Sequence, residues 1–210
     1  MRLAACILFS AASAVCFSQT WEVGGSAGAG IVRSVRVSNP LGRAAAGLSP
    51  SYAAGFLLGQ NLYERVGGEI RYTFRAGNLR LAKDGTKAAF SGQSHLIHYD
   101  VLLHPRSSLG GLKPFVALGA GGRIFRGTGQ EVLYQPLEEY ALLTKTQQAT
   151  PLVSLGGGVK VKLSPRIVLR LEFRDYVSPF PKQVMEPTIG STLNGWLHDF
   201  VPMVSLALVR

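Results

Sequence analysis

Three histidines and one aspartate near the middle of the sequence are the best candidates for metal or acid-base chemistry. His98, Asp100 and His104 are separated by even numbers of residues, so on a strand they share one face, whereas His95 lies on the other. The set does not converge on one point, and the sequence contains neither an HExxH motif nor zinc-ligand spacing. We therefore predict no catalytic residue, no metal site and no cofactor, and we expect these side chains to form hydrogen bonds inside the fold.

Two segments, residues 66–75 and 167–175, alternate apolar with charged residues, so a strand in either segment would have one charged face. Both signs of charge are present, and buried charge is tolerated only with such partners. We predict ion pairs that fill the interior of the fold, with an ion path as the alternative. The predicted network comprises Glu69, Arg71, Arg75, Arg123, Arg170, Glu172 and Arg174, with His98, Asp100, Lys160 and Lys162 as further candidates.

Basic residues crowd the segments between these regular stretches, and the chain has a formal net charge of +10. Such a surplus indicates phosphate-bearing partners, which include lipid headgroups as readily as nucleic acid. A nucleic-acid module gathers its charge on one face with stacking aromatics, which this sequence does not suggest. We predict contacts with glycolipid phosphates, with ordinary solvated loop charge as the alternative. The residues concerned are Arg33, Arg36, Arg43, Arg80, Lys83 and Lys87.

Glycine-rich segments at residues 24–30 and 119–122 could suggest phosphate cradles. Neither leads into a helix, and neither has the GxGxxG or Walker spacing. Glycine within a strand permits sharp coiling and close packing. We therefore interpret both segments as parts of strands.

The elements that must position all these residues are strands, because period-2 alternation dominates from Trp21 onward. Aromatic residues lie near several predicted strand ends, as the interfacial girdles of a transmembrane barrel would require: Tyr52, Tyr63, Tyr72, Phe115, Phe173 and Phe200. The eight predicted strands are residues 21–32, 51–60, 66–75, 94–104, 114–125, 151–163, 167–175 and 198–209.

The connections between these strands alternate in length. Long connections without structure of their own are uncommon in compact soluble domains, whereas a rhythm of long loops and short turns is typical of transmembrane barrels. We expect both termini at the end with the short turns. The short connections are residues 61–65, 105–113 and 164–166, and the long ones are residues 33–50, 76–93, 126–150 and 177–197.

Composition agrees with a barrel that spans a membrane. Of the 210 residues, 47% are hydrophobic and only 16% are charged, yet no stretch has the roughly 18 uninterrupted apolar residues that a spanning helix needs. A chain in lipid must satisfy its backbone hydrogen bonds internally, which leaves a closed barrel. A soluble lipocalin-like barrel with its apolar face inward around a ligand has the same period and stays an alternative.

The first residues are typical of a secretory signal. Arg2 gives the positive start, residues 3–15 are almost wholly apolar or small, and cleavage is expected after Ser18 or Gln19. Both cysteines, Cys6 and Cys16, lie in this segment, so the mature chain would have no disulfide. We predict a signal peptide at residues 1–18 and one barrel domain at residues 19–210.

The chain resembles the small eight-stranded outer-membrane barrels of Gram-negative bacteria, the group of OmpX and the OmpA transmembrane domain. The resemblance rests on the signal peptide and on the strands at residues 113–121 (KPFVALGAG) and 169–176 (LRLEFRDY), and it covers the mature chain. The last residues, Leu208-Val209-Arg210, depart from the terminal aromatic of that group, which its assembly machinery recognises.

The predicted fold class is all-β, a transmembrane antiparallel up-and-down β-barrel of eight strands. We expect an outer-membrane protein with a structural, adhesive or envelope-stabilising role and no enzymatic activity. Its expected partners are outer-membrane lipid, including glycolipid phosphates, and the barrel-assembly machinery; we expect no nucleic acid and a monomer. A lipid-modifying enzyme is a further alternative, built on Ser94-His95 or His198-Asp199, although the sequence shows nothing that would orient either pair.

Overall fold

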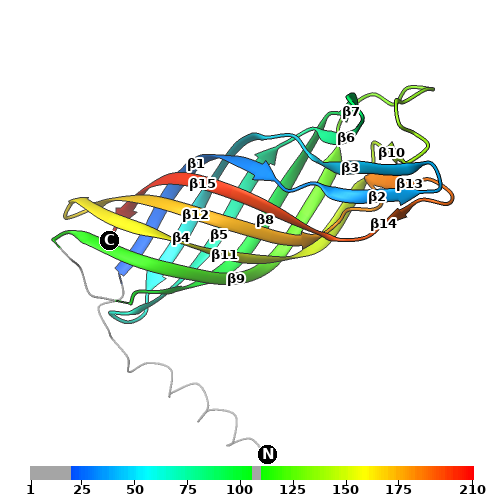
Figure 1. Ribbon diagram of the computed structural model, residues 1–210. Coiled ribbons are helices and arrows are strands. Elements are labelled where there is room, and N and C mark those ends of the chain that lie inside the picture. The colour runs from blue at the N-terminus through cyan, green and yellow to red at the C-terminus, as the bar shows by residue number, and fades with distance from the viewer. Residues whose placement is uncertain (1–19, 106–109) are drawn as a thin grey trace, which may run out of the picture.

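The structure, a computed structural model, describes residues 20–105 and 110–210, so the predicted signal peptide lies outside the described residues. Eight long strands pair in chain order into a closed antiparallel barrel, in which β1 pairs with both β4 and β15 (Figure 1). The described residues contain no helix long and apolar enough to cross a membrane. The barrel strands are β1 (Thr20–Val32), β4 (Ser51–Asn61), β5 (Val66–Ala76), β8 (Gly92–Leu103), β9 (Leu112–Gly127), β11 (Gln147–Ser164), β12 (Ile167–Pro179) and β15 (Trp196–Val209).

The predicted all-β barrel of eight strands is confirmed, and most strand ends lie within two residues of their predicted positions. The largest differences are at the end away from the termini. There β11 begins at Gln147, where it still pairs with Arg126 of β9, and β12 continues to Pro179, which pairs with Trp196 of β15. Ladder pairing thus continues beyond the point where the apolar alternation becomes hard to recognise.

Alternation along each strand separates an apolar outer surface from a polar interior. On β12, Leu171 and Phe173 are 45% and 53% exposed, whereas the side chains of Arg170, Glu172 and Arg174 are buried in the lumen. A lipocalin-like barrel would have the opposite arrangement, with the apolar face around a ligand. That alternative is wrong, because the exposed large apolar side chains lie on the outside of the barrel strands.

The start of β1, the end of β15 and the described parts of the short turns lie at one end of the barrel, the end with the termini (Figure 1). The backbone N–H of Trp21 donates to the carbonyl oxygen of Arg210 at 2.9 Å, and Arg210 returns the bond. The described parts of the short connections lie between β4 and β5, β8 and β9, and β11 and β12. The predicted rhythm of short and long connections therefore corresponds to the two ends of the barrel.

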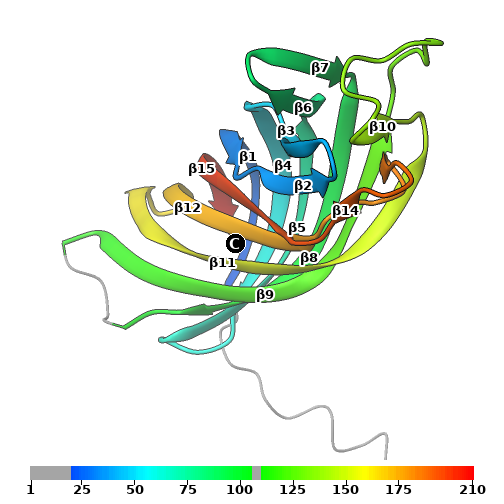
Figure 2. The same cartoon turned by 45° about the vertical axis from the view of Figure 1, so that its right-hand side comes forward.

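The long connections are not structureless, which corrects the expectation from sequence. They contain short strands that form a five-stranded sheet in the order β14-β2-β3-β6-β7 and a two-stranded sheet of β10 and β13 (Figures 1 and 2). We call these strands and the segments joining them to the barrel the cap. The cap strands are β2 (Val35–Asn39), β3 (Gly42–Leu48), β6 (Leu79–Lys83), β7 (Thr86–Phe90), β10 (Ala141–Leu143), β13 (Met185–Pro187) and β14 (Thr192–Leu193).

The five-stranded sheet continues the barrel wall beyond the barrel. In sequence, β2 follows β1, β3 leads into β4, β6 follows β5, and β7 leads into β8. The pairing β2-β3-β6-β7 repeats the barrel pairing β1-β4-β5-β8. The inner face of this sheet therefore continues the lumen, and its outer face continues the outer surface of the barrel.

The inner face of the cap is apolar, unlike the lumen below it. Val37 of β2 and Leu81 of β6 have no exposed surface, and Tyr140, Val184 and Met185 close the cluster from the other connections. Complete burial of a side chain such as Leu contributes about 1.5–3 kcal/mol. The cluster comprises Val32, Val37, Ala44, Ala46, Leu48, Leu79, Leu81, Ala88, Phe90, Phe125, Leu137, Tyr140, Ala141, Leu143, Phe180, Val184, Met185, Leu193 and Leu197.

A substitution in this cluster should unfold the cap and leave the barrel intact. L81D would place an unpaired carboxylate among buried apolar side chains, which is strongly unfavourable. We expect added protease to cleave the cap of L81D, while the strands in lipid stay protected and the unboiled protein keeps its folded mobility on a denaturing gel. A82D, on the opposite face of the same strand, is the control. Equal protease resistance of L81D and the wild type would contradict this account of the cap.

Candidate functional site

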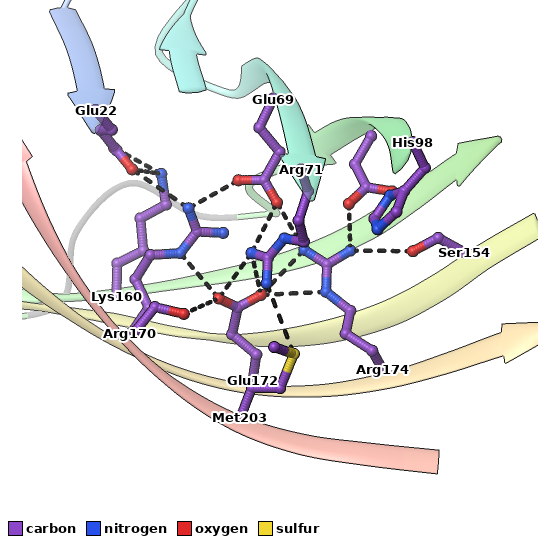
Figure 3. A network of polar contacts seen from close by, with 12 residues as sticks. Glu22, Glu69, Arg71, His98, Ser154, Lys160, Arg170, Glu172, Arg174 and Met203 are labelled. Atoms are coloured by element: carbon purple, nitrogen blue, oxygen red, sulfur yellow. Dashed lines mark hydrogen bonds and ion pairs between the residues drawn. The ribbon is translucent and has the colours of Figure 1, made fainter. Parts of the chain in front are cut away.

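The lumen is the candidate functional site because charged side chains from opposite walls meet inside it (Figure 3). Every second residue of a barrel strand points inward, and an eight-stranded barrel is just wide enough for those side chains to fill. Each cation of the network pairs with a carboxylate at 2.7–2.9 Å. The described residues of the network are Glu22, Glu69, Arg71, Arg75, His98, Asp100, Arg123, Lys160, Arg170, Glu172, Arg174 and Asp199.

Two carboxylates, Glu69 on β5 and Glu172 on β12, form the centre of the network. Glu69 accepts hydrogen bonds from Arg170 and Arg174 at 2.8 Å and from Arg71 at 3.0 Å. Glu172 accepts from Arg71 at 2.9 Å and from Arg174 at 3.0 Å. Because β5 and β12 lie on opposite sides of the barrel, these ion pairs join two walls that share no backbone hydrogen bonds.

At the end with the termini, the network continues through Glu22 of β1. Its carboxylate accepts hydrogen bonds from Lys160 Nζ at 2.7 and 2.8 Å and from Asn61 Nδ2 at 3.0 Å. A cavity of about 420 Å³ opens at this end, and its lining includes Glu22, Lys160, Lys113 and Lys162. Lys162 is exposed at this mouth and is not among the ion pairs, so its predicted place in the network is wrong.

Toward the cap, two further groups extend the network. Arg174 donates to Asp100 at 2.7 Å, and the imidazole of His98 lies 3.1 Å from the other oxygen of Asp100. Above them, Asp199 pairs with both Arg75 and Arg123 at 2.9 Å. This upper group is the last charged layer below the apolar cap.

Apolar side chains cover the outer end of this upper group. The guanidinium carbon of Arg123 lies 4.4 Å from the ring centroid of Phe125, which belongs to the apolar cluster of the cap. Leu197, two residues before Asp199 on β15, belongs to the same cluster. On β9 and β15, the inward positions thus change from charged to apolar within one side chain.

The structure brings the seven predicted network residues together in the lumen, along with His98, Asp100 and Lys160. Sequence reasoning missed Glu22 and Asp199. Alternation could have found Glu22, because it lies on the opposite face from Trp21 and Val23. The ring of Phe115 also faces the lumen, 5.1 Å from the guanidinium carbon of Arg170, so it is not part of an interfacial girdle.

The remaining histidines do not form the pairs considered for an enzyme. Ser94 is buried in the lumen, whereas His95 points outward and shares a 2.8 Å hydrogen bond with Tyr72. His198 also points outward and lies 2.8 Å from Asp175, while its neighbour Asp199 is buried. Among the described residues, no group of three His, Cys, Asp or Glu side chains could hold a metal ion.

Four of the six predicted basic residues share one surface, the outer face of the five-stranded sheet. Arg36, Arg43, Arg80 and Lys87 lie there at alternate strand positions. Lys83 instead donates hydrogen bonds to the hydroxyl of Tyr140 and to the carbonyl oxygen of Leu41, and the Tyr140 bond raises the pKa of Lys83. Arg33 is exposed at the junction between β1 and β2.

Breaking the centre of the network should destabilise the barrel. E172Q would leave three guanidiniums with less compensating charge, and removing one partner of a buried ion pair costs about 3–5 kcal/mol. The matched control on the same strand is D175N, whose ion pair with His198 is partly exposed, so a loss of about 1 kcal/mol or less is expected. Urea unfolding in lipid vesicles, followed by tryptophan fluorescence, measures both. Equal unfolding midpoints would contradict the assigned role of Glu172.

Acidification should destabilise the short-turn end through His104. Burial lowers the pKa of His104 from 6.5 to about 4, and its Nε2 has no hydrogen-bond partner among the described residues. Between these values the unfolded state binds a proton that the folded state does not, so stability falls as the pH drops from about 6.5 to about 4. We expect H104Q to lose less stability than the wild type between pH 7.5 and pH 4.5 in the same urea assay. An identical loss in both proteins would refute this role.

Comparison with known proteins agrees with this geometry at the level of the fold. The sequence matches no family model and no curated protein. The crystal structure of Neisserial surface protein A (NspA) is similar to this chain with a TM-score of 0.51 and 12% identity, over 90% of this chain and 96% of that one. The outer membrane protein OprG from Pseudomonas aeruginosa is similar with a TM-score of 0.50 and 10% identity, over 91% and 95% of the two chains. The chain therefore has the fold of the small eight-stranded outer-membrane β-barrels.

Proposed function

We propose that this protein spans the outer membrane of a Gram-negative envelope as a closed barrel with a structural or adhesive role, without catalytic activity. The observation that carries the proposal is the distribution of side chains, which is the reverse of that in a soluble barrel. Apolar side chains lie on the outside of the barrel, and ion pairs fill the lumen. An apolar exterior is stable in lipid, and a closed barrel leaves no unpaired strand edge there.

The proposed orientation places the termini in the periplasm and the cap outside the cell. Barrels of this kind have short periplasmic turns and longer extracellular connections. Aromatic side chains at both ends of the barrel lie where this orientation places the two membrane–water interfaces. Trp21 is exposed near the termini, and Tyr52 and Phe74 pack together near the cap with their ring centroids 6.1 Å apart.

We further propose that the barrel-assembly machinery inserts the chain and that the protein acts as a monomer.

The two layers described above, the ion-pair network and the apolar cluster of the cap, support a closed lumen. An ion would have to displace paired charges such as Arg174 and Glu172, which lie 3.0 Å apart with fully buried side chains. It would then have to cross the apolar cluster of the cap, where a bare charge is strongly disfavoured. The protein would thus present a folded surface to the environment without opening a path through the membrane.

The test is ion conductance in planar lipid bilayers. Because an ion would have to displace both layers, we expect the purified, folded protein to show no conductance above that of the bilayer alone. The altered mobility of an unboiled sample on a denaturing gel verifies that the barrel is folded. Discrete current steps from the folded wild type would overturn the closed-lumen proposal, and recovery of the protein in a detergent-free periplasmic fraction would overturn its place in the membrane.

A further inference from the structure

The outer face of the five-stranded sheet has a concentration of positive charge that the closed barrel does not use. Its cations are Arg36 on β2, Arg43 on β3, Arg80 on β6 and Lys87 on β7, and we call this surface the cationic face. All four lie opposite the side chains of the apolar cluster, because the residues beside them in each strand point inward.

Strand register arranges these cations around small residues. One row across the sheet contains Arg36, Ala45, Ala82 and Lys87, so that two alanines separate the two cations. Neighbouring strands lie about 4.8 Å apart, and the row therefore spans about 14 Å.

The other two cations lie above and below this row. Arg43 precedes Ala45 by two residues on β3, and Arg80 precedes Ala82 by two on β6. Since β3 and β6 are antiparallel, Arg43 lies farther from the barrel and Arg80 nearer to it. The result is a floor of small residues with a cation on each side.

The cationic face carries no compensating negative charge. The strands β2, β3, β6, β7 and β14 contain no acidic residue, and the nearest in sequence, Asp84, lies in the turn between β6 and β7. Over the described ranges 20–105 and 110–210, none of its four cations forms a hydrogen bond or ion pair through its side chain. Lys83, which does have partners, lies at the end of β6 beside Tyr140.

The location of the cationic face selects the kind of anion. The sheet continues the wall formed by β1, β4, β5 and β8 beyond the barrel (Figure 1). In the proposed orientation this face therefore lies directly above the lipid-facing surface of that wall. Tyr52, Phe74 and His95 form the aromatic group at the top of that lipid-facing wall. Side chains of this type gather at the level of lipid headgroups, so the cationic face begins where headgroups and their sugars lie.

We propose that the cationic face binds the phosphorylated sugars of an outer-leaflet glycolipid. Guanidinium groups bind phosphate oxygens through paired, charge-assisted hydrogen bonds, and three of the four cations are arginines. Alanines at the floor would let a sugar ring approach the sheet while cations on its edges reach phosphates. This proposal depends on the proposed orientation, with the cap on the outer side of the membrane.

The test compares two variants with equal loss of charge. R36Q/R43Q/R80Q/K87Q removes the cationic face, and R65Q/K113Q/K162Q/R166Q removes four cations at the opposite end of the barrel. Thermophoresis in neutral detergent would measure binding of a lipopolysaccharide with phosphorylated core sugars. We expect the first variant to lose affinity by about tenfold or more, and the second to bind as the wild type does. Dephosphorylated lipopolysaccharide should bind the wild type as weakly as the intact glycolipid binds the first variant.

Three outcomes would overturn the proposal. They are equal affinity of the first variant and the wild type, an equal loss in both variants, and binding of soluble dextran sulfate as tight as that of the glycolipid. The last would assign the face to free polyanions instead of membrane lipid. Folded mobility on an unboiled gel and the absence of conductance would show that the closed barrel persists, so failure of binding is distinguishable from failure of the proposed function.

Discussion

Closure of the sheet is the constraint on which the rest of this molecule depends. Because β1 pairs with β4 on one side and β15 on the other, the barrel wall has no free strand edge. Closure assigns alternate residues to the outside and the inside, and eight strands leave an interior only wide enough for side chains. Residues whose side chains point into the barrel must therefore pack against and pair with one another, whatever their charge.

The ion pairs of the lumen follow from this confinement, and they connect parts of the wall that backbone pairing cannot connect. Glu69 on β5 binds Arg170 and Arg174 on β12, and Asp199 on β15 binds Arg123 on β9. Each contact requires that two strands have the correct register, since a shift by one residue would turn a charged side chain toward lipid. The network thus helps to select one arrangement of the barrel.

Much of the barrel could be predicted from the sequence because alternation is a local property. The strand at residues 167–175 shows which of its side chains face lipid without reference to any other strand. The pairing partners could not be predicted, since they depend on positions across the lumen. Sequence proximity pairs Asp199 with His198 as a candidate enzyme site, although adjacent residues of a strand point to opposite faces.

The cap could not be predicted for a different reason. Its strands have two to seven residues, and their inner faces include small residues such as Ala44, Ala46 and Ala88, which give a weak alternation signal. The cluster they form combines residues from all four long connections. Its stability therefore comes from contacts between segments far apart in the chain, which no local pattern reports.

Because the cap cluster joins segments far apart in the chain, it also constrains the order of assembly. The apolar cluster of the cap cannot be completed until β12 and β15 have joined the barrel, because Val184, Met185 and Leu193 lie between those two strands. Contacts between distant segments also form slowly, since the intervening chain must first be ordered. We therefore expect the cap to be the last part of the molecule to fold, so that a protease-resistant cap would mark a chain whose insertion is finished.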